Sequence, residues 1–229
     1  MSDDKTELKE VYGDDGVTLE SIVDKDMNFF VYQDDGVTPL AFHDKNGGVT
    51  YFKSDGVTFD AFEDADGNKV FFQEDGVTIS SISDAEEKYA TFYQNDGKTV
   101  DKTVNIWYDI TAQYDKDGKN IVSVTDVNDE KLSSEEYSKE SREIVQQSQE
   151  IMATYNEHKK MLLNFKERVA THTSMKVQEQ VSKASSSRSG NSEAQQRFDG
   201  KVDEAEAKKA EAPAKTATKS SAGKQTNTR

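Results

Sequence analysis

Aspartate and glycine recur together in the first half of the sequence, a combination that calcium-binding loops use. The spacing Asp-x-Asp-Gly occurs at residues 64–67 and 115–118. A helix-loop-helix calcium loop also needs an acidic ligand two residues earlier and a glutamate near its twelfth position. Phe62 and Gln73 occupy those places in the first case. Turn formation explains these aspartates better, so the sequence predicts no metal site.

Side chains suited to acid–base or nucleophilic catalysis are few. The histidines are His43, in a predicted turn, and His158 and His172, on a predicted helix; there is no cysteine. No nucleophile can be placed beside a base, and no glycine-rich phosphate loop follows a predicted strand. The many carboxylates are expected as surface and turn residues rather than as a glycosidase pair. We therefore predict no catalytic residue and no cofactor, and expect a protein that is not an enzyme.

Paired aromatic residues form a third group, because exposed rings combine a large apolar surface with specific stacking geometry. The pairs are Tyr51-Phe52, Phe71-Phe72 and Phe92-Tyr93, each shortly before an Asp-Gly step. We take these six residues as candidate ligand-surface aromatics. Their solvent exposure decides whether they can stack on sugar rings.

The elements that position these residues follow from a 20-residue internal repeat. The tetrapeptide Asp-Gly-Val-Thr begins at Asp15, Asp35, Asp55 and Asp75. It returns as Asp-Gly-Lys-Thr at Asp96, after one inserted residue. The tight primed turns of hairpins need positive φ, which glycine adopts without steric cost. Residues 10–125 are therefore predicted to be a mostly β region of 20-residue hairpin repeats, an antiparallel meander of about ten to twelve short strands.

One repeat cannot bury its own aromatic face, so neighbouring units must cover it. Three arrangements do this: a hairpin solenoid or long twisted sheet, a closed barrel, or three chains wound together as in a fibre shaft. The regular period favours the open, repetitive arrangements.

The hydrophobic period changes after residue 131, where Ser133 or Ser134 can cap a helix. Apolar residues then alternate at spacings of four and three, the pattern of a coiled-coil seam. Self-association through this seam is the favoured interpretation, and an amphipathic helix packed on the β part is the alternative. The oligomerisation residues predicted from the seam are Tyr137, Ile144, Ile151, Tyr155, His158, Leu162, Phe165, Val169 and His172. Ser141 and Ser148 complete the series. In an oligomer the two histidines would face their copies, which predicts a seam that acid weakens.

Charge and composition divide the chain into three predicted parts. Residues 1–130, the β-hairpin repeat domain, hold 30 acidic and 11 basic residues. Residues 131–182 form the predicted helix or coiled coil, and residues 183–229 a Ser/Ala/Lys-rich tail expected to be disordered. The acidic body makes nucleic acid and membranes unexpected partners. The first residues lack the features of a signal peptide, so synthesis in the cytoplasm is expected.

Two resemblances bear on function. The period, paired aromatics and glycine turns of residues 55–96 resemble the choline- and glucan-binding cell-wall repeats of Gram-positive bacteria, although those are tryptophan-rich and here Trp107 is alone. The plan of repeat, coiled coil and polar tail over about residues 10–180 resembles phage fibre and baseplate virion structural proteins.

The second resemblance implies a non-enzymatic structural or adhesive homo-oligomer, located in the virion if phage-derived, with other virion proteins as partners. The alternative is a carbohydrate-binding repeat protein, with cell-surface polysaccharide as its partner. A hydrolase acting on a cell envelope is the third class.

Overall fold

The computed structural model describes residues 7–133 and 135–206, with side chains described up to residue 184. Twelve strands precede one helix. They are β1 (Leu8–Tyr12), β2 (Leu19–Asp24), β3 (Phe29–Tyr32), β4 (Pro39–His43), β5 (Val49–Phe52), β6 (Phe59–Glu63), β7 (Lys69–Phe72), β8 (Ile79–Ser83), β9 (Tyr89–Tyr93), β10 (Val100–Asn105), β11 (Ile110–Tyr114), β12 (Ile121–Thr125) and the helix is α1 (Glu135–Glu206).

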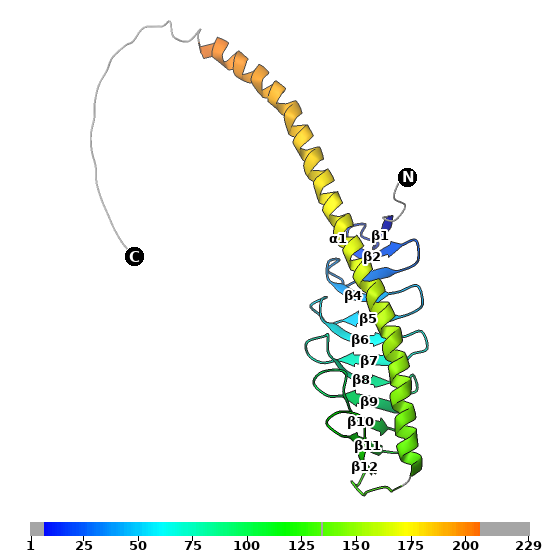
Figure 1. Cartoon of the computed structure of the whole chain (residues 1–229). Coiled ribbons are helices and arrows are strands. Elements are labelled where there is room, and N and C mark those ends of the chain that lie inside the picture. Colours follow the sequence, from blue (N-terminus) through cyan, green and yellow to red (C-terminus); the bar gives the residue numbers. More distant parts are fainter. Residues whose placement is uncertain (1–6, 134, 207–229) are drawn as a thin grey trace, which may run out of the picture. The chain divides into compact units, whose positions relative to one another are not determined.

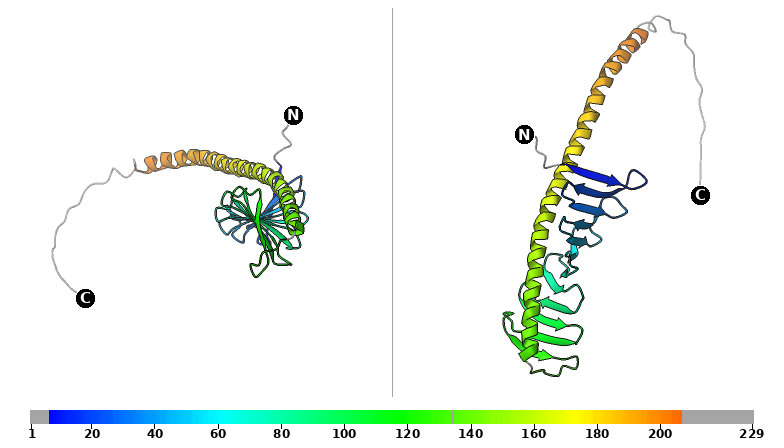
Figure 2. Two further views of the ribbon diagram at one scale, coloured as in Figure 1. Left: turned by 60° about the horizontal axis from the view of Figure 1, so that its bottom comes forward. Right: turned by 90° about the vertical axis from the view of Figure 1, so that its right-hand side faces the viewer.

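The strands form one antiparallel sheet in chain order, β1 to β12. Each 20-residue repeat adds two strands, so the predicted hairpin meander is confirmed. Of the three predicted arrangements the sheet adopts the long twisted one, because its first and last strands do not pair with each other to close a barrel. Figure 1 shows the strands stacked in order beside α1, and Figure 2 shows them fanning out around the stacking direction.

The Asp-Gly-Val-Thr turns are longer than the predicted two-residue primed turn. The Gln33 amide donates to the Thr38 carbonyl, so the loop between them has four residues. Gly36 has a φ of +65°, whereas the aspartate before it has no positive φ. Asp35 instead accepts hydrogen bonds from the amide and hydroxyl groups of Thr38. The prediction of positive φ at glycine is confirmed, and the primed-turn geometry is wrong because the aspartate carboxylate organises a wider loop.

Successive turns of this kind stack on one another. A Cβ atom built on Gly76 would lie 2.4 Å from Cγ2 of Thr58, and one built on Gly97 would lie 2.7 Å from Cγ2 of Thr78. From the second turn onward, the glycine therefore packs against the threonine of the turn one repeat earlier. This contact fixes the length of the repeat, because an altered loop would no longer fit its neighbour.

The predicted coiled-coil seam of α1 packs against the sheet of its own chain. Every seam residue from Ser141 to Phe165 is buried, and Tyr137, Val169 and His172 are partly buried. Leu162 and Phe165 share one core cluster with β1 to β6, and Ile151 and Tyr155 share another with β6 to β8. Assigning these residues to an oligomer seam is corrected by this burial, and the alternative of a helix packed on the β part is what the structure shows.

The helix rise and the strand spacing explain why the heptad pattern fits both a partner helix and a sheet. Alternating spacings of four and three advance about 5.2 Å per seam residue along a helix with a rise of about 1.5 Å. Neighbouring strands lie about 4.8 Å apart. A helix that crosses a sheet therefore offers close to one seam residue to each strand. The heptad pattern alone does not distinguish a partner helix from a sheet.

The covered face of the sheet, which packs against α1, has one central residue on each strand. Cross-strand partners lie on the same face, so this row can be followed through the pairing. From β2 to β10 it consists of Ile22, Phe30, Phe42, Thr50, Phe62, Val70, Ile82, Thr91 and Thr103. All nine are buried. The core of the protein is this row together with the seam of α1.

Two compact units make up the chain, Met1–Ser174 and Met175–Arg229. The predicted division at residue 130 is thus a change of secondary structure within the first unit. The helix continues past the predicted end at residue 182 to Glu206. Residues 207–229 of the predicted tail lie outside the described residues. Among the residues described, no helix is both long and apolar enough to cross a membrane.

Candidate functional site

A buried hydrogen-bonded relay joins the sheet to the helix. His158 Nε2 lies 2.8 Å from Thr50 Oγ1, and His158 Nδ1 lies 2.7 Å from Asp44 Oδ2. Asp44 follows β4, Thr50 is in β5, and His158 is on α1, so three segments converge. A neutral imidazole with its proton on Nδ1 donates to the carboxylate and accepts from the threonine hydroxyl. The order hydroxyl, imidazole, carboxylate is that of a catalytic triad.

The surroundings of the relay give it a structural role. Thr50 is 0% exposed and His158 is 1% exposed. The imidazole lies between the rings of Phe42 and Phe62, at centroid distances of 5.3 and 4.6 Å. A substrate carbonyl cannot reach a hydroxyl that is enclosed in this way, since attack needs the reacting atoms roughly 3 Å apart. The relay therefore fixes the position of α1 on the sheet.

Gly48 makes room for the histidine. At the equivalent place in the neighbouring repeats, Asn28 and Asn68 donate to the aspartate of their own turn, at 3.0 and 2.9 Å. A Cβ atom at Gly48 would lie 2.8 Å from Nδ1 of His158. In this repeat the imidazole replaces the asparagine amide as the donor to Asp44. The sequence signal for the relay is this break in the repeat, glycine where two other repeats have asparagine, and the prediction of an oligomer seam did not include it.

Other polar contacts fasten the helix along the sheet. Ser148 donates to Thr91 at 2.7 Å, and Ser141 lies 2.6 Å from Thr103. Both serines, which look like imperfections of a coiled-coil seam, are matched to threonines of the covered row. Nearer β1 the series continues with an ion pair, Arg168 with Asp24 at 2.7 Å, and with a contact of 3.1 Å between His172 Nε2 and Glu10 Oε1.

These polar pairs specify one register of helix on sheet. Shifting α1 by one seam position would place serine or histidine against apolar residues and leave the threonines unpaired. An unpaired buried polar group costs about 1–3 kcal/mol. Both seam histidines face the sheet of their own chain, which corrects the prediction that they face copies of themselves.

Burial controls the protonation of the relay histidine. Loss of water around the ring lowers the pKa of His158, while the Asp44 carboxylate opposes that shift. Burial also lowers the pKa of His43. At neutral pH the relay thus contains an uncharged imidazole.

The six candidate ligand-surface aromatics lie on both faces of the sheet. Tyr51 and Phe71 are 40% and 38% exposed on the open face, which is the face opposite α1. Phe92 is on the same face, but the Lys102 ammonium lies 4.9 Å from its ring centroid. Neighbouring residues of a strand point to opposite faces. Their partners in the pairs are therefore on the covered side.

This alternation corrects half of the predicted ligand surface. Phe52 is 6% exposed and belongs to the core. Phe72 and Tyr93 pack against the cluster that contains Ile151. The remaining ligand-surface candidates are Tyr51, Phe71 and, beneath Lys102, Phe92.

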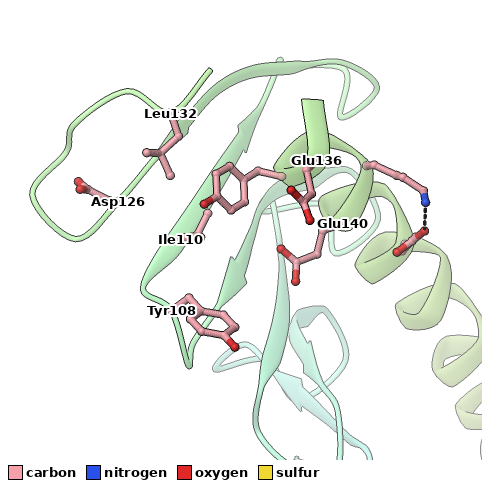
Figure 3. Close-up of a pocket in the computed structure, with 9 residues that line it drawn as sticks. Tyr108, Ile110, Asp126, Leu132, Glu136 and Glu140 are labelled. Carbon is pink, nitrogen blue, oxygen red and sulfur yellow. Dashed lines mark ion pairs between the residues drawn. The ribbon is translucent and has the colours of Figure 1, made fainter. Parts of the chain in front are cut away.

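A pocket of about 630 Å³ lies where α1 begins. Figure 3 shows Glu136 and Glu140 on the side of the helix that faces Ile110 and Tyr108. Glu140 Oε1 accepts a hydrogen bond from Asn105 Nδ2 at 2.9 Å, so this carboxylate anchors the first turns of the helix to β10. Acidic residues near a helix start also complement its dipole. Helix attachment accounts for the arrangement of this pocket.

Among the described residues, no group of three or more histidine, cysteine, aspartate or glutamate residues has the geometry to hold a metal ion. Comparison of the sequence with family models and with curated proteins finds no match.

Proposed function

We propose that this protein is a non-enzymatic structural and adhesive protein, an oligomeric component of an appendage such as a virion fibre. The observation that carries the proposal is the fastening of α1 to the sheet from β1 to β10. Apolar seam residues alternate with polar pairs over this distance, from His172 with Glu10 to Ser141 with Thr103. A repeat sheet braced in this way is a firm support whose second face is free for contacts.

The repeat itself supports a scaffold role. Each 20-residue unit contacts its neighbours through strand pairing and through stacked turns, as in other repeat proteins whose length grows by adding units. The triad-like relay supports a scaffold role as well, because its hydroxyl, imidazole and carboxylate groups hold the helix on the sheet.

Immunogold electron microscopy of lysates from the producing cells tests this proposal. An antibody raised against residues 7–133 is expected to label particles or filaments at regular sites, with pre-immune serum as the control. Label found only on dispersed single molecules would contradict an appendage role.

Carbohydrate binding is a second candidate, favoured by one observation. Tyr51 and Phe71 occupy equivalent places two strands apart on the open face, roughly 10 Å from each other. Two rings at that separation suit alternate sugars of an extended chain. Cell-wall polysaccharide should then sediment the intact protein, and Tyr51→Ala with Phe71→Ala should abolish this, whereas Val57→Ala with Val77→Ala in the exposed turns should not.

A further inference from the structure

The turn between β4 and β5 holds the one Asn-Gly step of the sequence, Asn46-Gly47. Both residues are exposed to solvent, and Gly47 has a φ of +90°. Glycine has no side chain to shield its own amide nitrogen, so that nitrogen can approach the side-chain carbonyl carbon of the residue before it. The amide group of Asn46 is therefore open to attack by the main chain.

The side chain of Asn46 is held weakly. Its Nδ2 lies 4.0 Å from Sδ of Met161, and a thioether is a weak acceptor. Among the described residues this is the only hydrogen bond of the Asn46 side chain. The backbone amide of Asn46 donates to Oδ1 of Asp44 at 2.6 Å, so the turn fixes the main chain while the side chain stays accessible.

Two asparagines of neighbouring turns are held at both ends of the side-chain amide group. Asn28 donates to the aspartate of its own turn at 3.0 Å and accepts from the Lys45 amide at 3.0 Å. Asn68 donates to the aspartate of its turn at 2.9 Å and accepts from the Ala85 amide at 3.1 Å. Each must break two hydrogen bonds before its amide group can react, which slows the reaction on the order of tenfold or more.

The Asp-Gly steps of the Asp-Gly-Val-Thr turns are protected in another way. Asp35 accepts hydrogen bonds from the Thr38 hydroxyl and from the amides of Thr38 and Val37, the latter two at 2.8 and 2.9 Å. The hydroxyl contact, followed by the two amide contacts, lowers the pKa of the Asp35 carboxyl, so the group is ionised at neutral pH. A carboxylate resists nucleophilic attack because it is negatively charged and has no good leaving group. Asn46 instead presents a neutral amide.

We propose that Asn46 is a site of spontaneous deamidation, which slowly loosens the attachment of α1 to the sheet. The Gly47 nitrogen attacks Cγ of Asn46 and passes its proton to Nδ2, so that a Cγ–N bond forms, the Cγ–Nδ2 bond breaks and ammonia leaves. Water then opens the resulting five-membered imide. Opening at Cγ gives aspartate. Opening at the main-chain carbonyl carbon gives isoaspartate, in which the main chain runs through the former side chain.

The reaction needs only a local opening of the turn. In the folded chain the Gly47 amide donates to the Asp44 carbonyl at 3.1 Å, and it must release this bond before it attacks. Residues 45–47 are all exposed, so opening them uncovers no core residue. Local openings of this kind cost much less free energy than global unfolding. Deamidation therefore proceeds in the folded protein, more slowly than in an unfolded chain.

The two products differ in their effect on the relay. Aspartate occupies the same place in two other repeats, as Asp26 and Asp66, so this product fits the turn. Isoaspartate lengthens the main chain by one carbon between Asp44 and Gly48, whose amide donates to Oδ1 of Asp44 at 3.0 Å. The carboxylate that accepts from His158 then loses part of its support.

Peptide mapping by mass spectrometry tests the proposal on the full chain, kept for several weeks at neutral pH and physiological temperature. We expect the peptide with Asn46 to gain one mass unit and to separate into aspartate and isoaspartate forms. The matched control is Asn128, which is exposed, has the same place in the last turn and is followed by aspartate. Asn128 should react on the order of tenfold more slowly, because a side chain follows it. An unmodified Asn46, or equal rates at the two sites, overturns the proposal.

Thermal unfolding of the aged protein tests the effect on the helix. Fully converted wild-type protein should unfold about 2–4 °C below fresh protein, the shift expected for one lost hydrogen bond in a chain of this size. Asn46→Gln should not change with age, because its longer side chain would have to close a six-membered ring. Asn46→Asp should unfold close to fresh wild type, as the aspartates of the other repeats predict.

The variant His158→Ala assigns the loss to the relay. Ageing should lower its unfolding temperature by less than that of the wild type, because the contact with Asp44 is already absent. An equal loss in both proteins, or isoaspartate that accumulates without lowering the unfolding temperature of the wild type, contradicts the link between deamidation and helix attachment.

Discussion

Nδ1 of His158 lies 2.7 Å from Oδ2 of Asp44, in the place that an asparagine side-chain amide occupies in the neighbouring repeats, where it donates to the turn aspartate. The helix thus completes a turn of the sheet that its own repeat leaves incomplete. The consequence is a link between residues more than one hundred positions apart in the sequence, and it makes the attachment of α1 depend on the charge of one imidazole.

We expect the stability of the first unit to fall as the pH is lowered from 7.5 to 5. Burial holds the pKa of His158 below its value of about 6.5 in the unfolded chain. The unfolded state therefore binds the proton first, so the stability due to this group is present above about pH 6.5 and is lost in acid. Thermal unfolding at both pH values measures the effect.

Two variants assign the pH dependence to one group. His158→Gln keeps a donor for Asp44 but cannot be protonated, so it should remove most of the difference between pH 7.5 and pH 5. Burial also lowers the pKa of His43, so His43→Gln measures the contribution of that residue to the pH dependence of stability. An unchanged difference in His158→Gln would contradict the assignment.

A double-mutant cycle between positions 48 and 158 tests the replacement of asparagine by histidine. Gly48→Asn alone should be destabilising, since its Cβ would lie 2.8 Å from Nδ1 of His158. His158→Ala alone leaves a cavity and removes the donor to Asp44 Oδ2, while Oδ1 keeps its bonds to the Asn46 and Gly48 amides, at a cost of about 2–4 kcal/mol. Combined, the new asparagine can donate to Asp44 as Asn28 and Asn68 do in their turns. The double variant should therefore be more stable than the sum of the single effects by about 1–2 kcal/mol in urea unfolding.

How far the sequence predicts this protein depends on the distance over which each feature acts. The hairpins follow from local signals, because Asp-Gly and alternating apolar residues act within a few positions. The partner of α1 does not follow, since a heptad advances by nearly one strand spacing. The facing of Tyr51 and Phe52 was equally undetermined: alternation separates the two residues, but only the position of the helix decides which one is covered.

The relay shows the limit for the candidate site. His158, Thr50 and Asp44 come together only once the register of helix on sheet is known. The local sequence sign of the contact between His158 and Asp44 is Gly48, which stands where two other repeats have asparagine. The sequence reveals such a departure, but it does not say which distant side chain fills the space.

Removing the hydroxyl of Tyr155 should leave the protein as stable or make it more stable. Its Oη atom is buried and has no hydrogen-bond partner among the described residues, and burial raises its pKa to about 12. Tyr155→Phe relieves that unpaired group, for a gain of up to about 1 kcal/mol. Tyr114→Phe is the matched control: Tyr114 Oη lies 2.9 Å from Ser141 Oγ, so its loss should cost about 1 kcal/mol in urea unfolding.

Two glycines with the same backbone conformation allow the cost of backbone strain to be measured separately from the cost of steric crowding. Gly16 and Gly76 have φ values of +68° and +64°. A Cβ at Gly16 meets nothing within 4 Å, whereas one at Gly76 lies 2.4 Å from Thr58 Cγ2. Gly16→Ala should cost about 1 kcal/mol for the left-handed backbone, and Gly76→Ala should cost clearly more. Equal losses in thermal unfolding would show that the stacked turns yield easily.

Deleting one repeat should be tolerated only when one heptad of the helix is deleted with it. Removing residues 55–74 takes out β6 and β7, about 9.6 Å of the sheet. Removing residues 151–157 shortens α1 by about 10.5 Å. These residues lie between two fixed contacts, His158 with Thr50 and Ser148 with Thr91, so the double deletion keeps both contacts in register. Each single deletion places a polar seam residue against the wrong strand.

Thermal unfolding of the three variants checks this prediction. A fourth variant, which combines the deletion of residues 55–74 with removal of residues 151–154 only, is the control, because it shortens the helix by the wrong length. If the repeat deletion alone unfolds as cooperatively as the double deletion, the polar contacts do not set the position of the helix.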